Sequence, residues 1–261
     1  MKLKDRVAIV TGAARGIGQE YCLALAREGA TVVAADILSC EETVTKVRKT
    51  GGEALGIGAD VTSEQSTRSL AAQTVQRFGR IDTLVNNAAF FGGLKLTSFD
   101  QIPEAEWDRV MTVNVKGMWL CCKAVIPVMK QQGKGRIINI SSASIWQGMP
   151  LLLHYVTSKG AVVTLTRALA RELAGSGITV NAITPGLTLT EASKAITDPE
   201  TFAGLKQRVL DRQIIKRSEE PSDLTGTVVF LASDDSEFIT GQTIKDSRHN
   251  ELTNFAFVLE Q

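Results

Sequence analysis

The sequence predicts an α/β domain, a doubly wound parallel sheet with helices on both faces, from three observations. Short apolar runs rich in β-branched residues alternate along the chain with longer segments of helical periodicity. The runs are nearly continuous in apolar residues, which is typical of parallel strands that are covered on both faces. A glycine-rich turn follows the first run, and such a sheet commonly binds its ligand at this place.

Six of the apolar runs are predicted to be strands, at residues 7–10, 31–35, 54–59, 81–85, 136–140 and 178–183. Residues 64–78, 107–129 and 155–174 are predicted to be helices. In the last of these, Ala161, Leu165 and Leu169 recur at helical spacing, and Gly175 ends the helix. The rhythm runs through the chain without a linker or an internal repeat, so we expect one domain over residues 1–261.

One segment breaks this rhythm. Residues 187–220 are polar, helical in pieces, and follow a strand. An insertion at the carboxyl edge of the sheet is well placed to cover a substrate, so we expect a lid here. A merely decorative insertion is the alternative.

The bulk composition argues against several classes of partner. The chain has 261 residues, and its 29 Lys and Arg against 28 Asp and Glu leave a net charge of +1. That balance gives no electrostatic reason to expect nucleic acid or an anionic membrane as a partner. No stretch reaches about 18 uninterrupted apolar residues, as a membrane span would. We therefore expect a cytoplasmic protein.

The cysteines and histidines argue against a metal site. Cys22, Cys40, Cys121 and Cys122 form no CxxC pair, so we expect reduced thiols rather than disulfides or zinc ligands. The chain has two histidines, and they lie far apart in sequence. We expect no metal.

The glycine-rich turn spans residues 11–18 and reads TGAARGIG. Glycines allow a tight turn and a close approach of the backbone to a pyrophosphate, and the following helix N-terminus adds free N–H groups. The turn lacks the Gly-Lys-Ser/Thr ending of a P-loop, which argues against an NTPase. It predicts a Rossmann-type dinucleotide site formed by Gly12, Arg15, Gly16, Ile17 and Gly18.

An acidic residue ends the second predicted strand. Asp36, followed by Ile37, stands 18 positions after Gly18. A carboxylate at about this spacing binds the ribose hydroxyls of the adenosine, and its charge would repel a 2′-phosphate. We therefore expect NAD(H) rather than NADP(H) as the cofactor. Arg15 is either a phosphate contact or a solvated loop residue.

A tyrosine and a lysine carry the candidate chemistry. Tyr155 and Lys159 are four positions apart in YVTSK, so they share one face of a helix. A free tyrosine, with a pKa near about 10, is a poor base, but a nearby ammonium favours its phenolate. Tyr155 is thus a candidate acid/base, and an ordinary surface pair is the alternative. Ser142 is either a hydroxyl that polarises a substrate carbonyl or a turn residue.

Together these motifs resemble the classical short-chain dehydrogenase/reductase family. The segments occur in the family's order over residues 5–244: the turn at 11–18, NNAA at 86–89, Asn114, the serines at 141–142, YVTSK at 155–159 and the Pro-Gly pair at 185–186. The resemblance implies hydride transfer between NAD(H) and a secondary alcohol or ketone carbon, without a metal.

The resemblance also implies a role for each matched residue. Tyr155 would be the general acid/base, Lys159 would lower its pKa and bind the nicotinamide ribose, and Ser142 would orient the substrate oxygen. Asn114 would hold a water of the proton relay. The other matches would line the cofactor: Asp60 and Val61 at the adenine, Asn87, Ala88 and Ala89 along the dinucleotide, and Pro185, Gly186, Thr188 and Thr190 at the nicotinamide.

Two departures from the family pattern stand out. Ala89 replaces the usual glycine, so a small and tolerated backbone shift is expected there. After Ile244 the chain reads KDSRHN in place of an apolar strand and an Asp-Gly-Gly turn. This puts the last strand in doubt and makes residues 245–261 an atypical tail. The family favours homotetramers and homodimers, and we expect one of these, although the tail weakens the case for tetramer contacts.

The substrate, a small alcohol or ketone, is expected to meet Ser144, Trp146, Leu152 and Leu187. Trp146 is either a flat apolar wall for a cyclic or aromatic substrate or a packing residue. Two other functions are weighed. Asp36 argues against an NADPH-dependent reductase of 3-oxoacyl thioesters. The intact catalytic residues argue against a catalytically silent, dinucleotide-binding regulatory protein.

Overall fold

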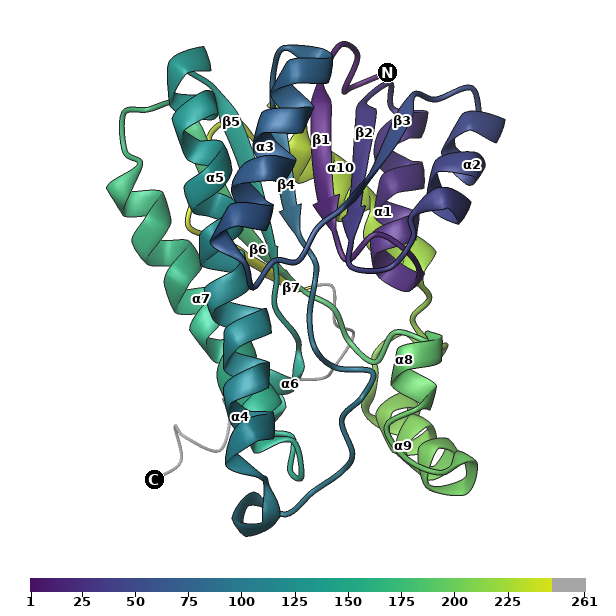
Figure 1. The fold of residues 1–261 in the computed structure, drawn as a ribbon. Coiled ribbons are helices and arrows are strands. Elements are labelled where there is room, and N and C mark those ends of the chain that lie inside the picture. The colour runs from purple at the N-terminus through teal and green to yellow at the C-terminus, as the bar shows by residue number, and fades with distance from the viewer. Residues whose placement is uncertain (246–261) are drawn as a thin grey trace.

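The computed structural model describes residues 1–245. Seven parallel strands form one sheet in the order β3-β2-β1-β4-β5-β6-β7 (Figure 1). They are β1 (Val7–Thr11), β2 (Thr31–Asp36), β3 (Ala54–Gly58), β4 (Thr83–Asn86), β5 (Gly135–Ile140), β6 (Ile178–Thr184) and β7 (Thr243–Lys245). The predicted doubly wound α/β fold is therefore confirmed.

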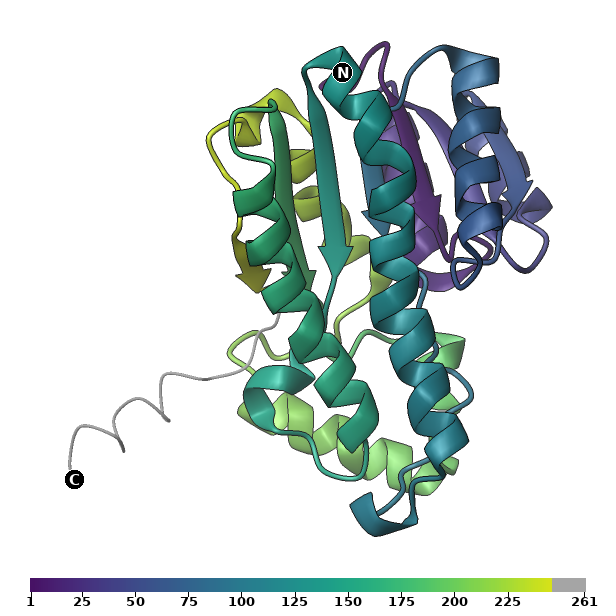
Figure 2. The same ribbon diagram turned by 60° about the vertical axis from the view of Figure 1, so that its left-hand side comes forward.

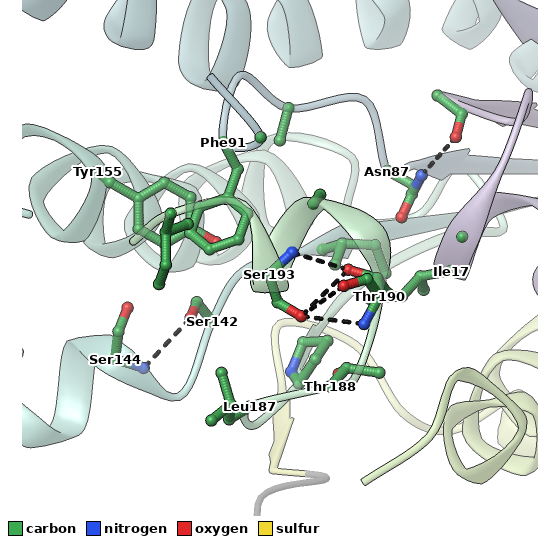
Figure 3. Close-up of a pocket in the computed structure, with 18 of the residues that line it drawn as sticks. Ile17, Asn87, Phe91, Ser142, Ser144, Tyr155, Leu187, Thr188, Thr190 and Ser193 are labelled. Atoms are coloured by element: carbon green, nitrogen blue, oxygen red, sulfur yellow. Dashed lines mark hydrogen bonds between the residues drawn. The ribbon is translucent and has the colours of Figure 1, made fainter. Parts of the chain in front are cut away.

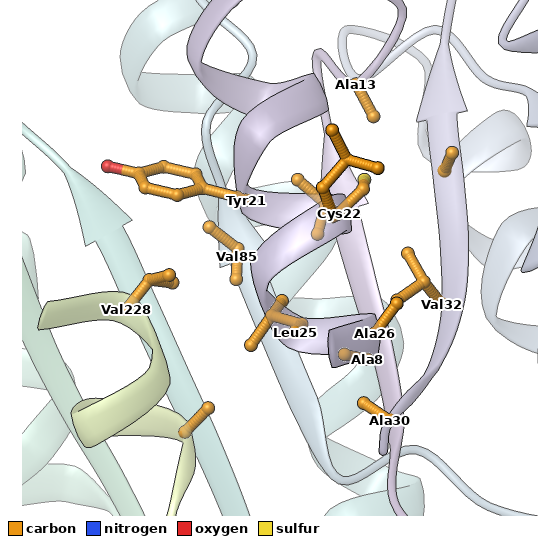
Figure 4. Packing of buried hydrophobic residues seen from close by; sticks show 14 of the residues in the cluster. Ala8, Ala13, Tyr21, Cys22, Leu25, Ala26, Ala30, Val32, Val85 and Val228 are labelled. Atoms are coloured by element: carbon orange, nitrogen blue, oxygen red, sulfur yellow. The ribbon is translucent and has the colours of Figure 1, made fainter. Parts of the chain in front are cut away.

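Helices cover both faces of the sheet (Figures 1 and 2). One core joins the sheet to α1 (Gly16–Arg27), α2 (Glu41–Lys49) and α10 (Thr225–Ala232), and the other joins it to α3 (Glu64–Phe78), α5 (Gly117–Gln132) and α7 (Leu153–Glu172). Figure 4 shows the first core, where Tyr21 and Leu25 of α1 approach Val228 of α10.

The two cores explain why the strands read as continuous apolar runs. Successive side chains of a strand point to opposite faces of the sheet. Along β1, Ala8 and Val10 belong to the first core, whereas Val7 and Ile9 belong to the second. Because both faces are covered, each of these positions must be apolar.

The helix predicted over residues 107–129 was wrong in its extent and its regularity. The structure has α4 (Glu104–Met111), a π-helical turn (Thr112–Lys116) and then α5. The helix begins before the apolar pattern does because Glu104 and Glu106 in its first turn interact favourably with the helix dipole. Apolar periodicity also does not reveal the additional residue that a π-turn accommodates.

The doubt about the last strand was misplaced, since β7 pairs in parallel with β6, with Ala182 opposite Thr243. Backbone hydrogen bonds make this short strand although its side chains are only partly buried. The rest of the atypical tail, residues 246–261, lies outside the described residues. The sequence also missed α2, whereas α3 has the predicted bounds, and Gly79 ends it at φ 75°.

The segment over residues 187–220 folds into two helices, α8 (Glu191–Lys194) and α9 (Pro199–Arg212), beyond the carboxyl ends of the strands (Figure 1). Each has a good N-cap, because the Thr190 hydroxyl accepts the Ser193 N–H and the Asp198 carboxylate accepts two N–H groups. Across residues 1–245, no helix combines the length and the apolar character that crossing a membrane requires.

Candidate active site

A cleft of about 1970 Å³ lies at the carboxyl ends of the strands. It begins beside the turn after β1, where the strand order reverses between β1 and β4, and it extends to α9. This reversal is where doubly wound sheets bind ligands. The volume exceeds the range of roughly 300–1,000 Å³ that is typical of a single drug-sized ligand, so the cleft has room for a dinucleotide and a second molecule.

The glycine-rich turn is shaped for close contact. Gly12 and Gly16 have φ values of 65° and 60°, which favour glycine. A Cβ atom on Gly18 would lie 2.2 Å from the Gly12 oxygen. The Asn87 side-chain amide donates to the Thr11 and Gly12 carbonyls at 3.0 Å, which joins the turn to the end of β4 (Figure 3).

The residues of this turn fit a pyrophosphate. The α1 helix starts at Gly16, and no side chain of the described residues caps its N-terminus. Its first N–H groups are therefore available to an anion. Gly12, Gly16, Ile17 and Gly18 line the cleft, as do Ala88 and Ala89 opposite them. Ala89 is exposed and does not have a positive φ, so the residue that replaces the usual glycine is accommodated without strain.

Asp36, the last residue of β2, lines the cleft next to the glycine-rich turn. Its carboxylate accepts the Ala14 and Leu38 N–H groups, both at 3.0 Å, so it is held at the end of β2. Ile37, Asp60 and Val61 line the cleft beside it. Arg15 lies 3.7 Å from Glu191 at the start of α8, so it connects the turn with the lid segment.

The candidate acid/base and its neighbours meet on the opposite wall. Tyr155 and Lys159 come from the first turns of α7, and Ser142, which follows β5, lines the same cleft (Figure 3). The Ser142 hydroxyl accepts the Ser144 N–H at 3.2 Å. Lys159 is buried and donates to the Ile140 carbonyl at 2.8 Å. Tyr155, Lys159 and Ser142 line the same cleft as the glycine-rich turn.

Burial shifts the pKa values of both Tyr155 and Lys159. Desolvation raises the pKa of Tyr155 to about 12, and the hydrogen bond to Ser142 only partly opposes it. Desolvation lowers the pKa of Lys159 to about 8. Desolvation therefore sets the direction of the Tyr155 pKa shift, and the expected lowering by the Lys159 ammonium stays a prediction.

Asn114 lies behind the cleft wall rather than on it. It is completely buried in the π-helical turn, where its side chain accepts the Phe90 N–H at 2.7 Å and donates to the Ser158 hydroxyl at 3.0 Å. The asparagine therefore connects the loop after β4 to α7. A π-turn at such a position is common near functional sites.

The loop after β6 completes the cleft. Pro185, Gly186, Thr188 and Thr190 line it. The carboxylate of Glu219, a buried residue that the sequence did not single out, accepts the Gly186 N–H at 3.0 Å and the Thr188 hydroxyl at 2.6 Å. Thr190 caps α8, and Figure 3 shows its contacts with Ser193. Both threonine hydroxyls are therefore already engaged within the protein.

Comparison with known proteins identifies the family. The family model described as Enoyl-(Acyl carrier protein) reductase matches residues 12–246. The chain is 39% identical over 243 residues to the 3-oxoacyl-(acyl-carrier-protein) reductase FabG of Staphylococcus epidermidis, which covers 92% of this chain and 96% of that protein. The chain belongs to the short-chain dehydrogenase/reductase family. It is therefore an oxidoreductase with a Rossmann fold.

Other members of the short-chain dehydrogenase/reductase family match nearly as well. The (2S)-((R)-hydroxy(phenyl)methyl)succinyl-CoA dehydrogenase subunit BbsD of Thauera aromatica is 39% identical over 246 residues, with 94% of this chain and 96% of that one covered. Among solved structures, levodione reductase has a TM-score of 0.89 at 32% identity, covering 94% of this chain and 97% of that one. A 7α-hydroxysteroid dehydrogenase in complex with NADH and 7-oxo glycochenodeoxycholic acid has a TM-score of 0.88 at 34% identity, covering 94% of each chain.

The four residues that were expected to contact the substrate are part of the cleft lining, and their role stays a prediction. Ser144, Trp146, Leu152 and Leu187 all line the cleft. Ser144 is buried, and its hydroxyl has no partner among the described residues. Leu152 is also buried and packs with Leu94 and Val110. The indole of Trp146 is 41% exposed, and the Lys245 ammonium lies 4.2 Å from its ring centre.

Sequence reasoning missed two neighbours of Tyr155. The Phe91 ring packs 4.8 Å from the tyrosine ring, measured between centroids (Figure 3). His154, the preceding residue, is completely buried, and its Nε2 lies 3.1 Å from a Glu106 carboxylate oxygen of α4. A histidine directly before the candidate acid/base was a visible signal, but its partner 48 residues away was not.

Within residues 1–245, no group of three or more histidine, cysteine or acidic side chains is placed to hold a metal ion. All four cysteines are free and buried, as expected from their spacing. Burial raises the pKa of each thiol.

Proposed function

We propose that this protein transfers a hydride between NAD(H) and the carbon of a secondary alcohol or ketone. The observation that carries the proposal is that Ser142 and Tyr155 line the same cleft as the glycine-rich turn. A substrate oxygen placed between two hydroxyls could exchange a proton with one and receive a hydrogen bond from the other. When bound, the nicotinamide ring would supply the hydride chemistry.

The chain's own residues have separate roles in this proposal. In the reductive direction, Tyr155 gives its proton to the substrate oxygen, and its raised pKa keeps that proton in place near neutral pH. In the oxidative direction, Tyr155 takes the proton back as a phenolate, which a charged Lys159 stabilises. Ser142 donates a hydrogen bond to the oxygen as negative charge develops on it. Asn114 holds the loop after β4 against α7 and so fixes the position of Tyr155.

Asp36 supports NAD(H) over NADP(H). Its carboxylate is fixed where a dinucleotide's adenosine ribose would bind, and it would repel a 2′-phosphate. The two nearby cations that line the cleft are already paired with carboxylates, Lys46 with Glu42 at 2.8 Å and Arg15 with Glu191 at 3.7 Å. These pairs are exposed and weak, but both cations that line this half of the cleft within residues 1–245 have a carboxylate partner.

The second candidate is an NADPH-dependent reductase of 3-oxoacyl thioesters. The identity to the Staphylococcus epidermidis reductase favours it, and Asp36 opposes it. A silent regulatory role is disfavoured by the placement of Ser142, Tyr155 and Lys159 on one wall of the cleft. We further propose a cytoplasmic homodimer or homotetramer that acts on a small-molecule alcohol or ketone, with neither nucleic acid nor a membrane as a partner.

A spectrophotometric screen at 340 nm tests the proposal. Purified protein is mixed with NAD or NADP and a panel of secondary, cyclic and sugar alcohols and hydroxyacyl thioesters. Turnover of an alcohol with NAD, and little with NADP, supports the proposed function. Turnover confined to NADP(H) and acyl thioesters favours the second candidate, and NADH binding without turnover of any substrate favours the silent role.

A further inference from the structure

Two arginines of the lid segment face the cleft without an ionic partner. Arg208 and Arg212 lie one helical turn apart on α9, and both line the cleft, as do Leu205 and Val209 of the same helix. Within residues 1–245, neither arginine forms an ion pair or a hydrogen bond through its side chain. The cleft-lining face of α9 thus combines two guanidinium groups with apolar side chains.

The neighbouring charges do not neutralise this pair. Glu191 pairs with Arg15, and Asp223 pairs with Arg217. Asp211, the acidic residue between the two arginines in sequence, also lines the cleft and keeps its charge, but its hydrogen bond at 2.7 Å comes from Gln207 rather than from either arginine, so two cations outnumber one carboxylate here. The Lys216 ammonium donates to the Leu210 and Asp211 carbonyls and so caps the end of α9. The positive charge of Arg208 and Arg212 therefore remains available to a ligand.

Much of the cleft lining outside the glycine-rich turn is apolar. Leu96, Met149 and Leu151 line it from the loops beyond β4 and α6 (Ser144–Gln147), and Ile196 and Ile214 line it from the lid segment. An apolar wall favours burial of an apolar body, whereas arginine binds carboxylate and phosphate oxygens with two parallel hydrogen bonds. The ligand that satisfies both is an apolar molecule with an anionic group at one end.

The position of α9 separates this pair from the proposed pyrophosphate site. The start of α8 is the part of the lid segment next to the glycine-rich turn, since a Cβ atom on Gly16 would lie 3.8 Å from a Thr190 methyl group. The chain then continues through α8 to α9, which lies farther from the sheet (Figures 1 and 2). The arginines therefore belong to the part of the cleft that α9 lines, whereas the glycine-rich turn lies beside the start of α8.

We propose that Arg208 and Arg212 form an anion subsite, and that the substrate is an apolar alcohol or ketone with a carboxylate or phosphate remote from its reacting carbon. This inference rests on the proposed function and deepens it. Binding of the anion would draw α9 toward the Tyr155 wall, so the same contact would recognise the substrate and cover it.

The test compares two ketones that differ in one charge, 4-(3-oxobutyl)benzoate and its methyl ester. Their dissociation constants are measured by calorimetry with NADH present, in a Tyr155→Phe background that cannot turn them over. We expect the carboxylate to bind about tenfold more tightly than the ester, and Arg208→Ala or Arg212→Ala to remove about that factor. Ester binding should change less than twofold.

Lys206→Ala is the matched control, because Lys206 is a cation on α9 that does not line the cleft. It should leave both dissociation constants unchanged. If all three variants lost the same affinity for the carboxylate, a general effect of net charge would explain the result and the proposed subsite would be wrong. A parallel loss of NADH affinity in the arginine variants would assign the pair to the cofactor phosphates instead. Equal binding of the two ketones, or binding of neither, would also overturn it.

The proposed function is judged separately. Turnover of the same ketones by the unmodified enzyme is followed at 340 nm. Carboxylate binding that depends on both arginines, without turnover of either ketone, would keep the subsite and count against the ketone chemistry. Turnover of both ketones at equal kcat/KM would keep the chemistry and overturn the subsite.

Discussion

The Lys159 ammonium lies 5.7 Å from the centre of the Tyr155 ring, while its hydrogen bond goes to the Ile140 carbonyl at 2.8 Å. The lysine is thus held beside the tyrosine by the end of β5. Both groups are desolvated, and burial moves their pKa values in opposite directions, to about 12 for Tyr155 and about 8 for Lys159. Both shifts favour the uncharged form of the side chain, as expected for groups that lose their contact with water on folding.

Removal of the tyrosine hydroxyl tests its role directly. We expect Tyr155→Phe to lower kcat by about 10³-fold or more, because the substitution removes the hydroxyl that exchanges the proton in the proposed reaction. NADH affinity, measured by fluorescence titration, should change less than twofold. Tyr21→Phe makes the same chemical change in the core between α1 and the sheet, and it should retain turnover. Wild-type turnover in Tyr155→Phe would rule out the assigned role.

The lysine makes stability depend on pH in a definite direction. Its folded pKa of about 8 lies below the ordinary value of 10.5, so the unfolded chain binds more protons between these values. The free energy of unfolding should therefore rise with pH there, by up to about 1.4 kcal/mol per pH unit from this group. Urea unfolding at pH 7.5 and 9.5 should show a wild-type stability that increases relative to Lys159→Met. A difference that stays constant, or shrinks as pH rises, would contradict the assigned pKa.

Asp36 should determine the choice of cofactor. Asp36→Asn retains a side-chain oxygen to accept a backbone N–H but removes the charge. We expect kcat/KM with NAD to fall about 10-fold to 100-fold, because charged hydrogen bonds to the ribose are lost, while kcat/KM with NADP rises. The ratio of the two constants is the measurement, and an unchanged Tm shows that the turn is intact. An unchanged ratio would mean that the carboxylate does not contact the ribose.

Two glycine-to-alanine substitutions should affect different properties, one lowering NADH affinity and the other raising stability. Gly18→Ala would place a methyl group 2.2 Å from the Gly12 oxygen, so the turn must deform, and NADH affinity should fall at least about tenfold. Gly226→Ala lies in α10 with nothing within 4 Å of the new Cβ atom, and it should raise the free energy of unfolding by about 0.5–1 kcal/mol. Calorimetry of NADH binding and urea unfolding measure the two effects. Normal NADH affinity in Gly18→Ala would argue against a pyrophosphate at this turn.

The four thiols should be inert in the folded protein. Burial raises the pKa of Cys40 to about 11 and of Cys122 to about 12, and it also raises those of Cys22 and Cys121. At pH 8 the thiolate fraction is then below about 1%, and iodoacetamide reacts with the thiolate. Mass spectrometry should find no alkylation of the native protein within minutes and four adducts after denaturation. Rapid native labelling would show that a segment opens.

The strands and the glycine-rich turn could be predicted because their signals are local. Each strand of a covered parallel sheet must be apolar at successive positions, as Val7 to Val10 are, whatever the rest of the chain does. The turn has its glycines because only they tolerate its backbone and its close contacts. The placement of Tyr155 and Lys159 on one helix face likewise follows from their spacing.

What the sequence did not reveal depends on contacts between distant segments. Glu219 holds the loop at Gly186 from 33 positions away, and Glu106 reaches His154 across 48. Neither pair has a sequence signature. The direction of the Tyr155 pKa shift was also out of reach, because desolvation sets it, and the spacing of Tyr155 and Lys159 does not report how deeply the tyrosine is buried.

The π-helical turn at residues 112–116 supports the loop after β4 and α7 only if it contains the right number of residues. A π-turn takes up one additional residue and leaves the faces of the flanking α-helices in register, so a chain without that residue would close the turn into a regular α-helix. Glu106 would then still face His154, whereas Asn114 would lose the wide turn that places it between Phe90 and Ser158. A single-codon deletion in this turn should therefore disturb the contacts of Asn114 before it disturbs the packing of α4 on α7.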